Sequence, residues 1–307
     1  MNIAIFKKRF VRLISNPMYY VKLFLKMFIL KTSKYWSDTR FIKIMYWIRT
    51  GDYLKLKNPV RFIDKQNWLK LHDRNPLYTQ LVDKYLVKKY VSNCIGEEYV
   101  VPCLGHWNSP DEIDFDKLPN KFVLKCNHNS GGGMCICKDK NSLDFNLVRN
   151  GLRKGLLDDF FKYSRVWPYK NVQRCIIADM FLDDHTGNEL RDYKFLCFNG
   201  VPKIMYCTNK GDNIYENFYD MEFNPLDITH GYPRITPEIE KPKEFDLMKE
   251  LATKLSKNIP FVRVDFFNVD GHVYFGEFTF FDWGAMKPMN DKWEILIGSW
   301  IDINNND

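Results

Sequence analysis

The stretch Phe261–Phe281 carries charged side chains within two runs that are otherwise dense in Val, Phe and Tyr. Residues two apart in an extended strand share one face, so Arg263 faces the same way as Asp265, and Glu277 the same way as Thr279. One cation, two carboxylates and a hydroxyl are unstable in a dry core unless something neutralises them. Mg²⁺ held by carboxylates and phosphate oxygens would do so, and an arginine beside it would meet a phosphate in transfer. The pattern favours phosphoryl-transfer chemistry, and the alternative is an Arg–Asp ion pair with Glu277 in solvent.

The register of the two runs decides which side chains meet. They are joined at Asp270-Gly271, which is typical of a β-hairpin turn. A two-residue turn sets Asp265 opposite Gly276 and sends Glu277 to the other face. A three-residue loop, with Gly271 in the left-handed conformation, sets Asp265 opposite Glu277. We expect the second register, in which both carboxylates share one face.

A second stretch, Phe122–Lys138, joins a short buried strand to a return strand through a glycine-rich loop, and Lys125 lies at its root. The loop consists of Ser130, Gly131, Gly132 and Gly133. Glycine amides can approach phosphate oxygens closely, and the lysine adds a fixed positive charge. No Gly-Lys-Ser/Thr follows and a strand comes next, so this is not a Walker P-loop. The stretch predicts either a phosphate-binding flap or an ordinary hairpin.

Two further pairs of charged residues recur at the spacing of a regular element. Asp192 and Lys194 share one face of an otherwise apolar strand. Lys84 and Lys88 share one face of a helix, which alone is typical of a solvated surface.

The elements that must position these residues follow from hydrophobic periodicity and turn signals. Helices are predicted within residues 60–92, 145–163 and 244–258, strands at 99–104, 122–124, 134–137 and 174–182, a second hairpin of residues 192–198 and 202–208 about Asn199-Gly200, and loops at 105–118 and 209–227.

The composition of the 307 residues, with 45% hydrophobic and 16% aromatic residues, predicts a large core and excludes a disordered protein. Eight cysteines show no C-x-x-C pair, and no secretory signal precedes them. We interpret them as free thiols in a reducing cytoplasm. Cys135 and Cys137, the only close pair, more often pack as small hydrophobes than bind metal, so zinc is not expected.

Positive charge is concentrated in residues 1–57, which hold thirteen Lys or Arg against two Asp, a net charge of +11. Because the whole chain carries +7, the other 250 residues sum to −4. Cations interrupt the apolar residues every few positions, so no run of 18 uncharged residues could span a bilayer. The segment either lies in an anionic membrane interface or packs as a basic helical layer on the body.

Five motifs in order resemble the TupA-like ATP-grasp family of bacterial cell-surface polysaccharide biosynthesis, over about Phe62–Ile303. They are D-K-x-x-V-K at 83–88, the strand and glycine flap at 122–138, I-I-A-D at 176–179, D-Y-K-F at 192–195, and R-V-D…G-E-F-T at 263–279. The resemblance implies an α+β protein with an ATP-grasp fold, in which antiparallel sheets are flanked by helices, after a basic helical N-terminal segment. It divides the chain into that segment at 1–57, an N-terminal subdomain at 58–120, a nucleotide-binding subdomain with the flap at 121–182, and a metal-binding and acceptor subdomain at 183–307.

The resemblance also implies roles for individual residues. The residues that would bind ATP are Lys88, Lys125, Ser130, Gly131, Gly132, Gly133, Ile177, Asp179, Phe181 and Asp192; those that would hold Mg²⁺ are Asp265, Glu277 and Thr279; and the catalytic pair would be Arg263 and Lys194. Two departures from the family pattern stand out. Thr279 replaces a usual Asn metal ligand, and Asp179 replaces a longer Glu near the adenine linker.

The activity implied is a ligase that activates a carboxylate as an acyl phosphate and transfers it to an amine. The partners would be a carboxylate on a sugar or polysaccharide of the capsular, O-antigen or teichuronic type, and a small amine or amino acid. Nucleic acid is not expected, and the location would be the cytoplasm or the inner face of the membrane. A sugar kinase and a non-catalytic nucleotide-binding scaffold are alternatives. A glycosyltransferase is disfavoured, because Asp114-Phe115-Asp116, the one D-x-D, lies in an acidic loop and not after an apolar strand.

Overall fold

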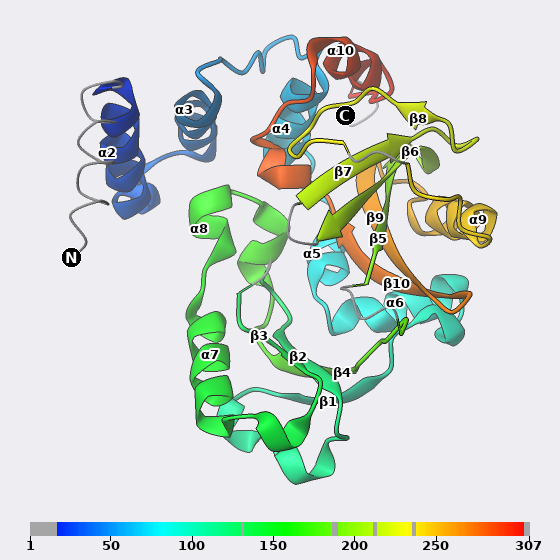
Figure 1. Ribbon diagram of the computed structural model, residues 1–307. Coiled ribbons are helices and arrows are strands. Elements are labelled where there is room, and N and C mark those ends of the chain that lie inside the picture. Colours follow the sequence, from blue (N-terminus) through cyan, green and yellow to red (C-terminus); the bar gives the residue numbers. More distant parts are fainter. Residues whose placement is uncertain (1–16, 130–131, 186–189, 211–213, 235–237, 304–307) are drawn as a thin grey trace.

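Two antiparallel sheets form the body of the protein in the computed structural model, which describes residues 17–129, 132–185, 190–210, 214–234 and 238–303 (Figure 1). The smaller sheet has the strand order β1-β4-β2-β3, and the larger has the order β10-β9-β5-β6-β7-β8. A single bridge between Val100 and Phe275 links the segment before β1 to the larger sheet. The strands are β1 Cys103–Trp107, β2 Phe122–Cys126, β3 Met134–Cys137, β4 Ile176–Met180, β5 Asp192–Phe198, β6 Val201–Lys210, β7 Ile214–Tyr219, β8 Pro225–Leu226, β9 Phe261–Val269 and β10 His272–Thr279.

Helices pack against both sheets, and the buried apolar residues form two separate cores, one for each sheet. One core joins the larger sheet to α3 through α6, α9 and α10, and the other lies between the smaller sheet and α7. The helices are α2 Pro17–Lys31, α3 Asp38–Thr50, α4 Phe62–His72, α5 Leu77–Val82, α6 Leu86–Ile95, α7 Phe145–Leu157, α8 Phe160–Ser164, α9 Phe245–Leu255 and α10 Asp291–Ser299. The mixture of helices and antiparallel sheets confirms the predicted α+β class. Because β1 belongs to the smaller sheet, that sheet crosses the subdomain boundary predicted at residue 120.

Local sequence explains why several elements begin or turn where they do. The Asp144 carboxylate caps α7 by accepting hydrogen bonds from the backbone N–H groups of Asn146 and Leu147, at 2.9 and 3.0 Å. Between β9 and β10, Asp270 and Gly271 have φ values of 51° and 83°. Two consecutive positive φ angles define a two-residue turn of the kind that Asp-Gly favours.

Several predicted elements are confirmed, and three details are wrong. The predicted loop at 209–227 contains β7 and β8. The strand predicted at 99–104 begins at Cys103 and extends through the start of the predicted loop at 105–118. The three-residue hairpin loop is a two-residue turn, because Val269 pairs directly with His272.

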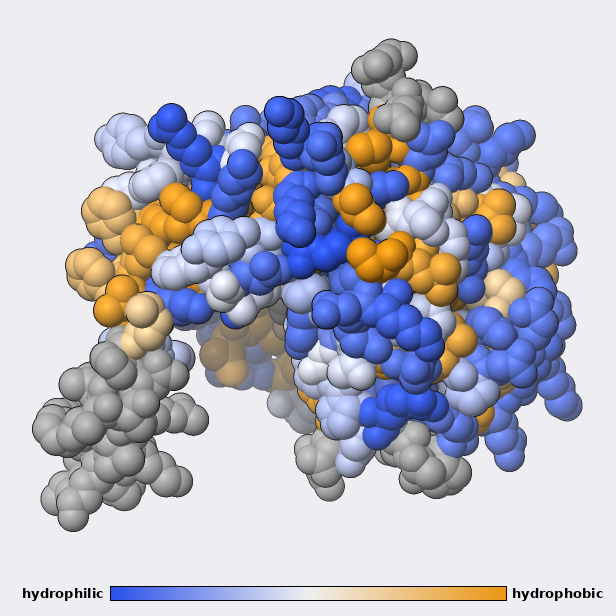
Figure 2. Space-filling view, turned by 90° about the horizontal axis from the view of Figure 1, so that it is seen from above, coloured by the Kyte–Doolittle hydropathy of each residue, from blue (hydrophilic) through white to orange (hydrophobic). Residues whose placement is uncertain are grey.

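The N-terminal helices lie at one side of the body (Figure 1). Among the described residues, α2 contacts α3 and leaves many large apolar side chains exposed: Met18, Val21, Leu23, Phe24, Met27 and Phe28. Figure 2 shows hydrophobic side chains gathered at this side of the molecule. Within the described ranges, no helix combines the length and apolar character needed to cross a membrane.

Candidate active site

A β-bulge in β10 brings Glu277 to the same face as Asp265. Near the turn the pairing follows the two-residue register, with Phe275 opposite Phe266, but beyond the bulge Thr279 lies opposite Arg263. Two residues of β10, Gly276 and Glu277, oppose the single residue Asp265 of β9, and this one extra residue shifts the following side chains to the other face. The hairpin therefore reaches the predicted arrangement of carboxylates by a different route.

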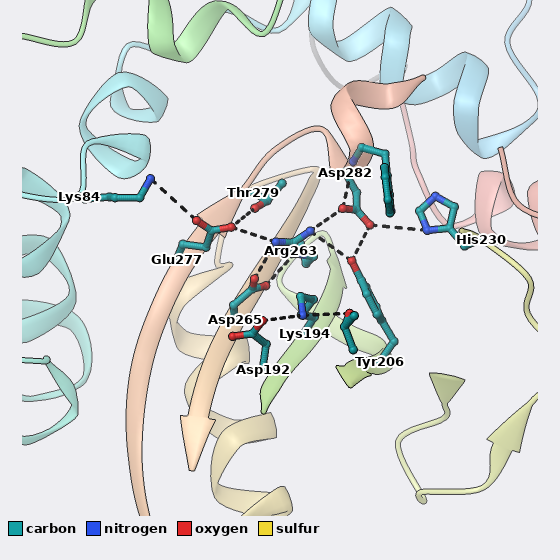
Figure 3. A network of polar contacts seen from close by, with 12 residues as sticks. Lys84, Asp192, Lys194, Tyr206, His230, Arg263, Asp265, Glu277, Thr279 and Asp282 are labelled. Carbon is teal, nitrogen blue, oxygen red and sulfur yellow. Dashed lines mark hydrogen bonds and ion pairs between the residues drawn. The ribbon is translucent and has the colours of Figure 1, made fainter. Parts of the chain in front are cut away.

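Arg263 is the centre of the resulting polar network (Figure 3). Its Nε and Nη2 donate to the two oxygens of Asp265, both at 2.7 Å, and Nη2 also donates to Glu277 Oε1 at 3.0 Å. Its Nη1 donates to Asp282 Oδ1 at 2.5 Å. Thr279 donates its hydroxyl to Glu277 Oε1 at 3.2 Å. Arg263, Asp265, Glu277 and Thr279 therefore lie together. The Arg–Asp ion pair of the alternative interpretation is present as well, and the Glu277 side chain is 38% exposed while it contacts Arg263.

The charges at this centre do not balance. Asp265, Glu277 and Asp282 surround one guanidinium; Lys84 lies 4.0 Å from Glu277 Oε2, and Lys194 lies opposite Asp265 on β5. Burial raises the pKa of Asp265 to about 7, with Arg263 opposing and Glu277 adding to that rise. A buried carboxyl in this state gains stability from an added cation. Within the described ranges, no three His, Cys, Asp or Glu side chains form a ready metal cage. Two carboxylates meeting at one Arg263 nitrogen nevertheless fit Mg²⁺, which takes its remaining ligands from phosphate and water.

Three residues of the network were not predicted from the sequence. Asp282, Tyr206 and His230 come from three separate segments, and Tyr206 donates its hydroxyl to Asp282 Oδ2 at 2.8 Å. His230 Nδ1 lies 3.9 Å from the same oxygen. Burial opposes ionisation of Asp282, but Arg263 and its other neighbours hold the pKa of this carboxyl below its usual value. Of the three, only Asp282 had a sequence signal, because this charged residue directly follows the aromatic pair Phe280-Phe281 after β10.

Lys194 extends the polar face to the neighbouring strands. It lies opposite Asp265 in the pairing of β5 with β9, and its Nζ donates to Asp192 Oδ2 at 3.1 Å and to Thr208 Oγ1 at 3.3 Å. Thr208 in turn lies opposite Glu216 of β7. Glu216 is 2% exposed, and burial raises its pKa to about 7. The aromatic-rich run 214–219 is the sequence signal for this strand, which lies within the predicted loop at 209–227.

A pocket of about 410 Å³ lies between the smaller sheet and residues of β5 and β9 in the larger one. Its wall is largely apolar, and the residues that line it include Val123, Met134, Ile136, Met180, Phe181, Leu182, Leu190 and Phe267. Lys125, Asp179 and Asp192 add charged groups to the lining. An apolar cleft with a few fixed polar groups is the usual form of a site for a small molecule.

Two of the predicted phosphate-binding lysines converge on one carboxylate. Lys125 Nζ lies 2.7 Å from Asp179 Oδ2, and Lys88 Nζ lies 2.9 Å from Asp179 Oδ1. Lys88 also donates to the Val101 carbonyl at 2.6 Å. Asp179 therefore holds both lysines, of which Lys125 lines the pocket and Lys88 lies behind Asp179 outside the lining. Ile177 is completely buried and does not line the pocket, whereas Phe181 does.

The glycine flap follows Lys125 on β2, but Ser130 and Gly131 lie outside the described residues. Gly133 has a φ of 64°, and an added Cβ would lie 2.8 Å from both Cys126 Sγ and the Gly155 Cα. Glycine at 133 is therefore required by its backbone conformation and by its packing on α7. Asn129 joins the flap to α7 by donating to the carbonyl groups of Gly132 and Gly155.

Two antiparallel sheets, with a lysine-lined pocket between them and a carboxylate centre beside it, define an ATP-grasp protein. The family model of the TupA-like ATPgrasp matches residues 64–302. The chain belongs to this family, as the sequence resemblance predicted.

Solved structures of ATP-grasp enzymes show more distant likenesses. A D-alanine–D-alanine ligase from Bacillus anthracis, complexed with ATP, is 17% identical, with 65% of this chain and 53% of that chain covered and a TM-score of 0.39. The D-alanine–D-alanine ligase from Helicobacter pylori is 16% identical, with coverages of 74% and 61% and a TM-score of 0.42. Biotin carboxylase from Campylobacter jejuni is 14% identical, with coverages of 65% and 40% and a TM-score of 0.41. The chain thus spans less than two thirds of these proteins, and the family assignment does not depend on them. No curated protein matches the chain.

Proposed function

We propose that the protein is an ATP- and Mg²⁺-dependent ligase that joins a carboxylate to an amine through an acyl phosphate. The observation that carries this proposal is the Arg263 centre, where three carboxylates face one guanidinium beside a lysine-lined pocket. Phosphoryl transfer needs positioning and charge neutralisation more than a reactive side chain, and this arrangement supplies both. The family context supports a uronic acid of a surface polysaccharide as the carboxylate, and a small amine or amino acid as its partner.

In this mechanism the base of ATP lies in the apolar pocket, with Lys125 and Lys88 directed at its phosphates. A carboxylate oxygen attacks the γ-phosphorus, the bond to the bridging oxygen breaks, and ADP leaves with that electron pair. Arg263 stabilises the charge of the phosphoryl group in transfer. Asp265 and Glu277, with Thr279 beside them, would hold Mg²⁺, which when bound neutralises phosphate charge. The amine then attacks the acyl carbon, loses a proton and expels phosphate.

The test is incubation with ATP, MgCl₂ and D-glucuronate, with and without an amine panel of L-glutamate, L-lysine and ethanolamine. The proposal expects release of ADP and phosphate that depends on an amine, together with an amide product in mass spectra. Formation of a phosphosugar without an amine would instead establish a kinase. ATP turnover equal with and without every amine would reject the ligase.

We also propose that the enzyme works at an anionic membrane surface, through α2. Six large apolar or aromatic residues of this helix are about half or more exposed: Met18 at 53%, Tyr19 at 49%, Val21 at 56%, Phe24 at 70%, Met27 at 50% and Phe28 at 49%. Soluble monomers rarely expose so many neighbouring apolar side chains. The lysines of the same helix supply the charge that anionic headgroups attract.

A further inference from the structure

The turn that follows β10 has an unusual backbone. Trp283, Gly284 and Ala285 have φ values of 50°, 64° and 52°, so three consecutive residues, two of them with a Cβ, adopt the left-handed conformation. Such conformations are unfavourable for L-residues and persist only where surrounding contacts enforce them. The left-handed turn at 283–285 therefore depends on contacts from another element.

Helix α4 supplies such contacts through two buried polar side chains. Lys70 Nζ donates to the Gly284 carbonyl at 2.6 Å, and Asn67 Nδ2 donates to the Ala285 carbonyl at 2.7 Å. Residues three apart in a helix are neighbours on its surface, so the two donors lie side by side. Two consecutive carbonyl groups of the left-handed turn are thus fixed to a helix that lies far away in the sequence.

Asp282, the residue before this turn, contacts Arg263 (Figure 3). Its carboxylate is buried and accepts hydrogen bonds from Arg263 Nη1 at 2.5 Å and from the Tyr206 hydroxyl at 2.8 Å. Asp282 Oδ1 also accepts from the backbone N–H of Trp283 at 3.1 Å. Because the carboxylate is bound to the backbone of the turn, a shift of the turn would displace the group that fixes one end of the Arg263 guanidinium.

The burial of Lys70 has a cost that packing alone does not explain. Lys70 is 1% exposed, and the centre of the Phe281 ring lies 5.9 Å from its Nζ. Burial, together with the positive charge of Arg49, lowers the pKa of Lys70 to about 7, while Asp38 opposes this change. An apolar side chain of similar length would fill the same space without desolvating an amine. The hydrogen bond to the turn is the contribution that only the amine makes.

We propose that Lys70 is a positioning residue for the Arg263 centre. By holding the Gly284 carbonyl, Lys70 keeps the left-handed turn formed, and the turn keeps Asp282 on Arg263. Lys70 contacts the backbone of the turn, so it acts on the reaction through Asp282. The inference rests on the proposed function, because the step that it serves is the phosphoryl transfer that Arg263 would stabilise.

The variant Lys70→Met removes the amine and keeps the apolar stem of the side chain. The relief of a buried charge should offset the loss of one hydrogen bond, so the melting temperature should stay within a few degrees of the parent. Lys65→Met is the matched control in the same helix. Lys65 Nζ donates to the backbone carbonyl of Ile301 at 2.6 Å, and burial lowers the pKa of Lys65 as well, but Ile301 lies beyond α10 and outside the turn.

Hydrogen–deuterium exchange reports directly on the turn. Within it, the amides of Gly284 and Met286 donate to the carbonyl groups of Phe281 and Trp283 at 2.8 and 3.3 Å. We expect a peptide that spans residues 280–287 to exchange at least tenfold faster in Lys70→Met than in the parent. The same peptide should exchange as in the parent in Lys65→Met, and peptides of β5 and β6 should be unchanged in both variants.

Turnover then tests whether Lys70 acts through Asp282. Amine-dependent release of ADP is measured for the parent, Lys70→Met, Asp282→Asn and the double variant. We expect Lys70→Met to lower kcat at least tenfold and to leave KM for ATP within threefold, because no residue of α4 lines the nucleotide pocket. In the Asp282→Asn background the same change should lower kcat less than threefold, since the group that Lys70 positions is already altered. Lys65→Met should keep the parental kcat.

Three results would overturn the positioning role. They are parental exchange of the turn in Lys70→Met, a loss of kcat that is as large in the Asp282→Asn background as in the parent, and a fall in melting temperature of more than about 10 °C, which would assign Lys70 to stability. A parent that releases no ADP with any amine would count against the proposed function instead. The exchange measurement needs no turnover, so it still decides whether Lys70 orders the turn.

Discussion

Arg263 illustrates how a single residue can organise a site that its neighbours in sequence only partly reveal. Asp265 lies two residues away and was predicted from strand alternation, as were Glu277 and Thr279. Asp282 and Tyr206 reach the same guanidinium from separate segments, at 2.5 and 3.2 Å. No periodicity within one segment encodes such contacts, because they depend on how the sheet and the segment after β10 pack together. The sequence therefore predicted the hairpin half of the centre and missed the other half.

The proposed Mg²⁺ ligands, Asp265 and Glu277, can be tested one carboxylate at a time. Asp265→Asn and Glu277→Gln should each lower turnover at least a hundredfold, because either change removes an oxygen anion without opening a cavity. Melting temperatures should stay within a few degrees of the parent. Asp270→Asn, in the turn of the same hairpin, is the matched control, since Asn tolerates its φ of 51°. Parental turnover in either site variant at saturating Mg²⁺ would remove the assignment.

The nucleotide role of Lys125 can be tested by binding alone. Lys125→Met keeps the apolar stem of the side chain but removes a charge from the pocket, and Asp179 retains Lys88 at 2.9 Å. We expect ATP·Mg²⁺ to bind about tenfold or more weakly by calorimetry, with little change in melting temperature. Lys117→Met, at a side chain that is 84% exposed, should bind as the parent does. An unchanged affinity of Lys125→Met for ATP·Mg²⁺ would show that residues 122–138 form an ordinary hairpin with no phosphate-binding role.

Glu216 predicts a pH dependence of stability. Burial, together with the nearby charge of Asp282, raises its folded-state pKa from 4.5 to about 7, while Lys194 and Lys287 oppose this rise. An acid with a raised folded-state pKa stabilises the fold fully below pH 4.5 and loses that contribution as the pH rises through 7. In the variant Glu216→Gln, the side-chain amide is uncharged at every pH. Relative to the parent, Glu216→Gln should therefore gain up to about 3 kcal/mol of unfolding free energy between pH 4 and pH 8.

The measurement is urea denaturation of parent and variant across this pH range. Glu222→Gln, at an exposed position beyond the same strand, should track the parent throughout. A difference between Glu216→Gln and the parent that stays constant with pH would show that the pKa of Glu216 is the same in the folded and unfolded states, and would contradict the raised folded-state pKa.

At the scale of elements, the β9–β10 hairpin shows why a predicted side-chain arrangement can survive a wrong turn. Asp-Gly chemistry favours two positive φ angles and hence two residues, which by itself would send Glu277 away from Asp265. The bulge at Gly276 reverses that outcome, and a glycine inside a strand was its sequence signal. The loop predicted at 209–227 failed for another reason. Polar residues flank the run 214–219, so its hydrophobic pattern is too short to predict a strand. The strand is stabilised by antiparallel pairing with β6, which local sequence does not encode.

The bulge can be tested with a single methyl group. A Cβ on Gly276 would lie 3.1 Å from the Asp265 carbonyl oxygen, so Gly276→Ala presses on the strand that carries this carboxylate. We expect a loss of about 1–3 kcal/mol of stability and a larger proportional loss of turnover than of ATP binding. Gly151→Ala in α7 is the control. Its Cβ meets nothing within 4 Å, so stability should rise by about 0.5–1 kcal/mol. Parental turnover in Gly276→Ala would show that the bulge does not set the position of Glu277.

At the scale of the whole molecule, a basic N-terminal segment with exposed apolar side chains is set against a body of net negative charge. Residues 1–57 carry +11 against −4 for the rest, and α2 within them exposes several neighbouring apolar side chains (Figure 2). A layer that served only to pack on the body would bury those side chains. Among the described residues, only Ile29 of α2 is completely buried. This combination of basic charge and exposed apolar surface is the physical basis for expecting contact with an anionic bilayer.

Binding to the membrane should therefore have an electrostatic part and an apolar part, which salt can separate. Each cation near an anionic bilayer contributes about 1 kcal/mol, and physiological salt screens charges beyond about 8 Å. We expect co-sedimentation with phosphatidylglycerol vesicles and not with phosphatidylcholine vesicles, reduced but not abolished by added salt. Neutralising Lys7, Lys8, Arg9 and Arg12, which lie outside the described residues, should remove the salt-sensitive part. Replacing Phe24 and Met27 by Asn should remove the salt-resistant part, whereas Leu147→Asn, at a remote side chain that is 70% exposed, should change neither. Absence of binding to anionic vesicles at low salt would show instead that the exposed face of α2 does not serve as a membrane contact.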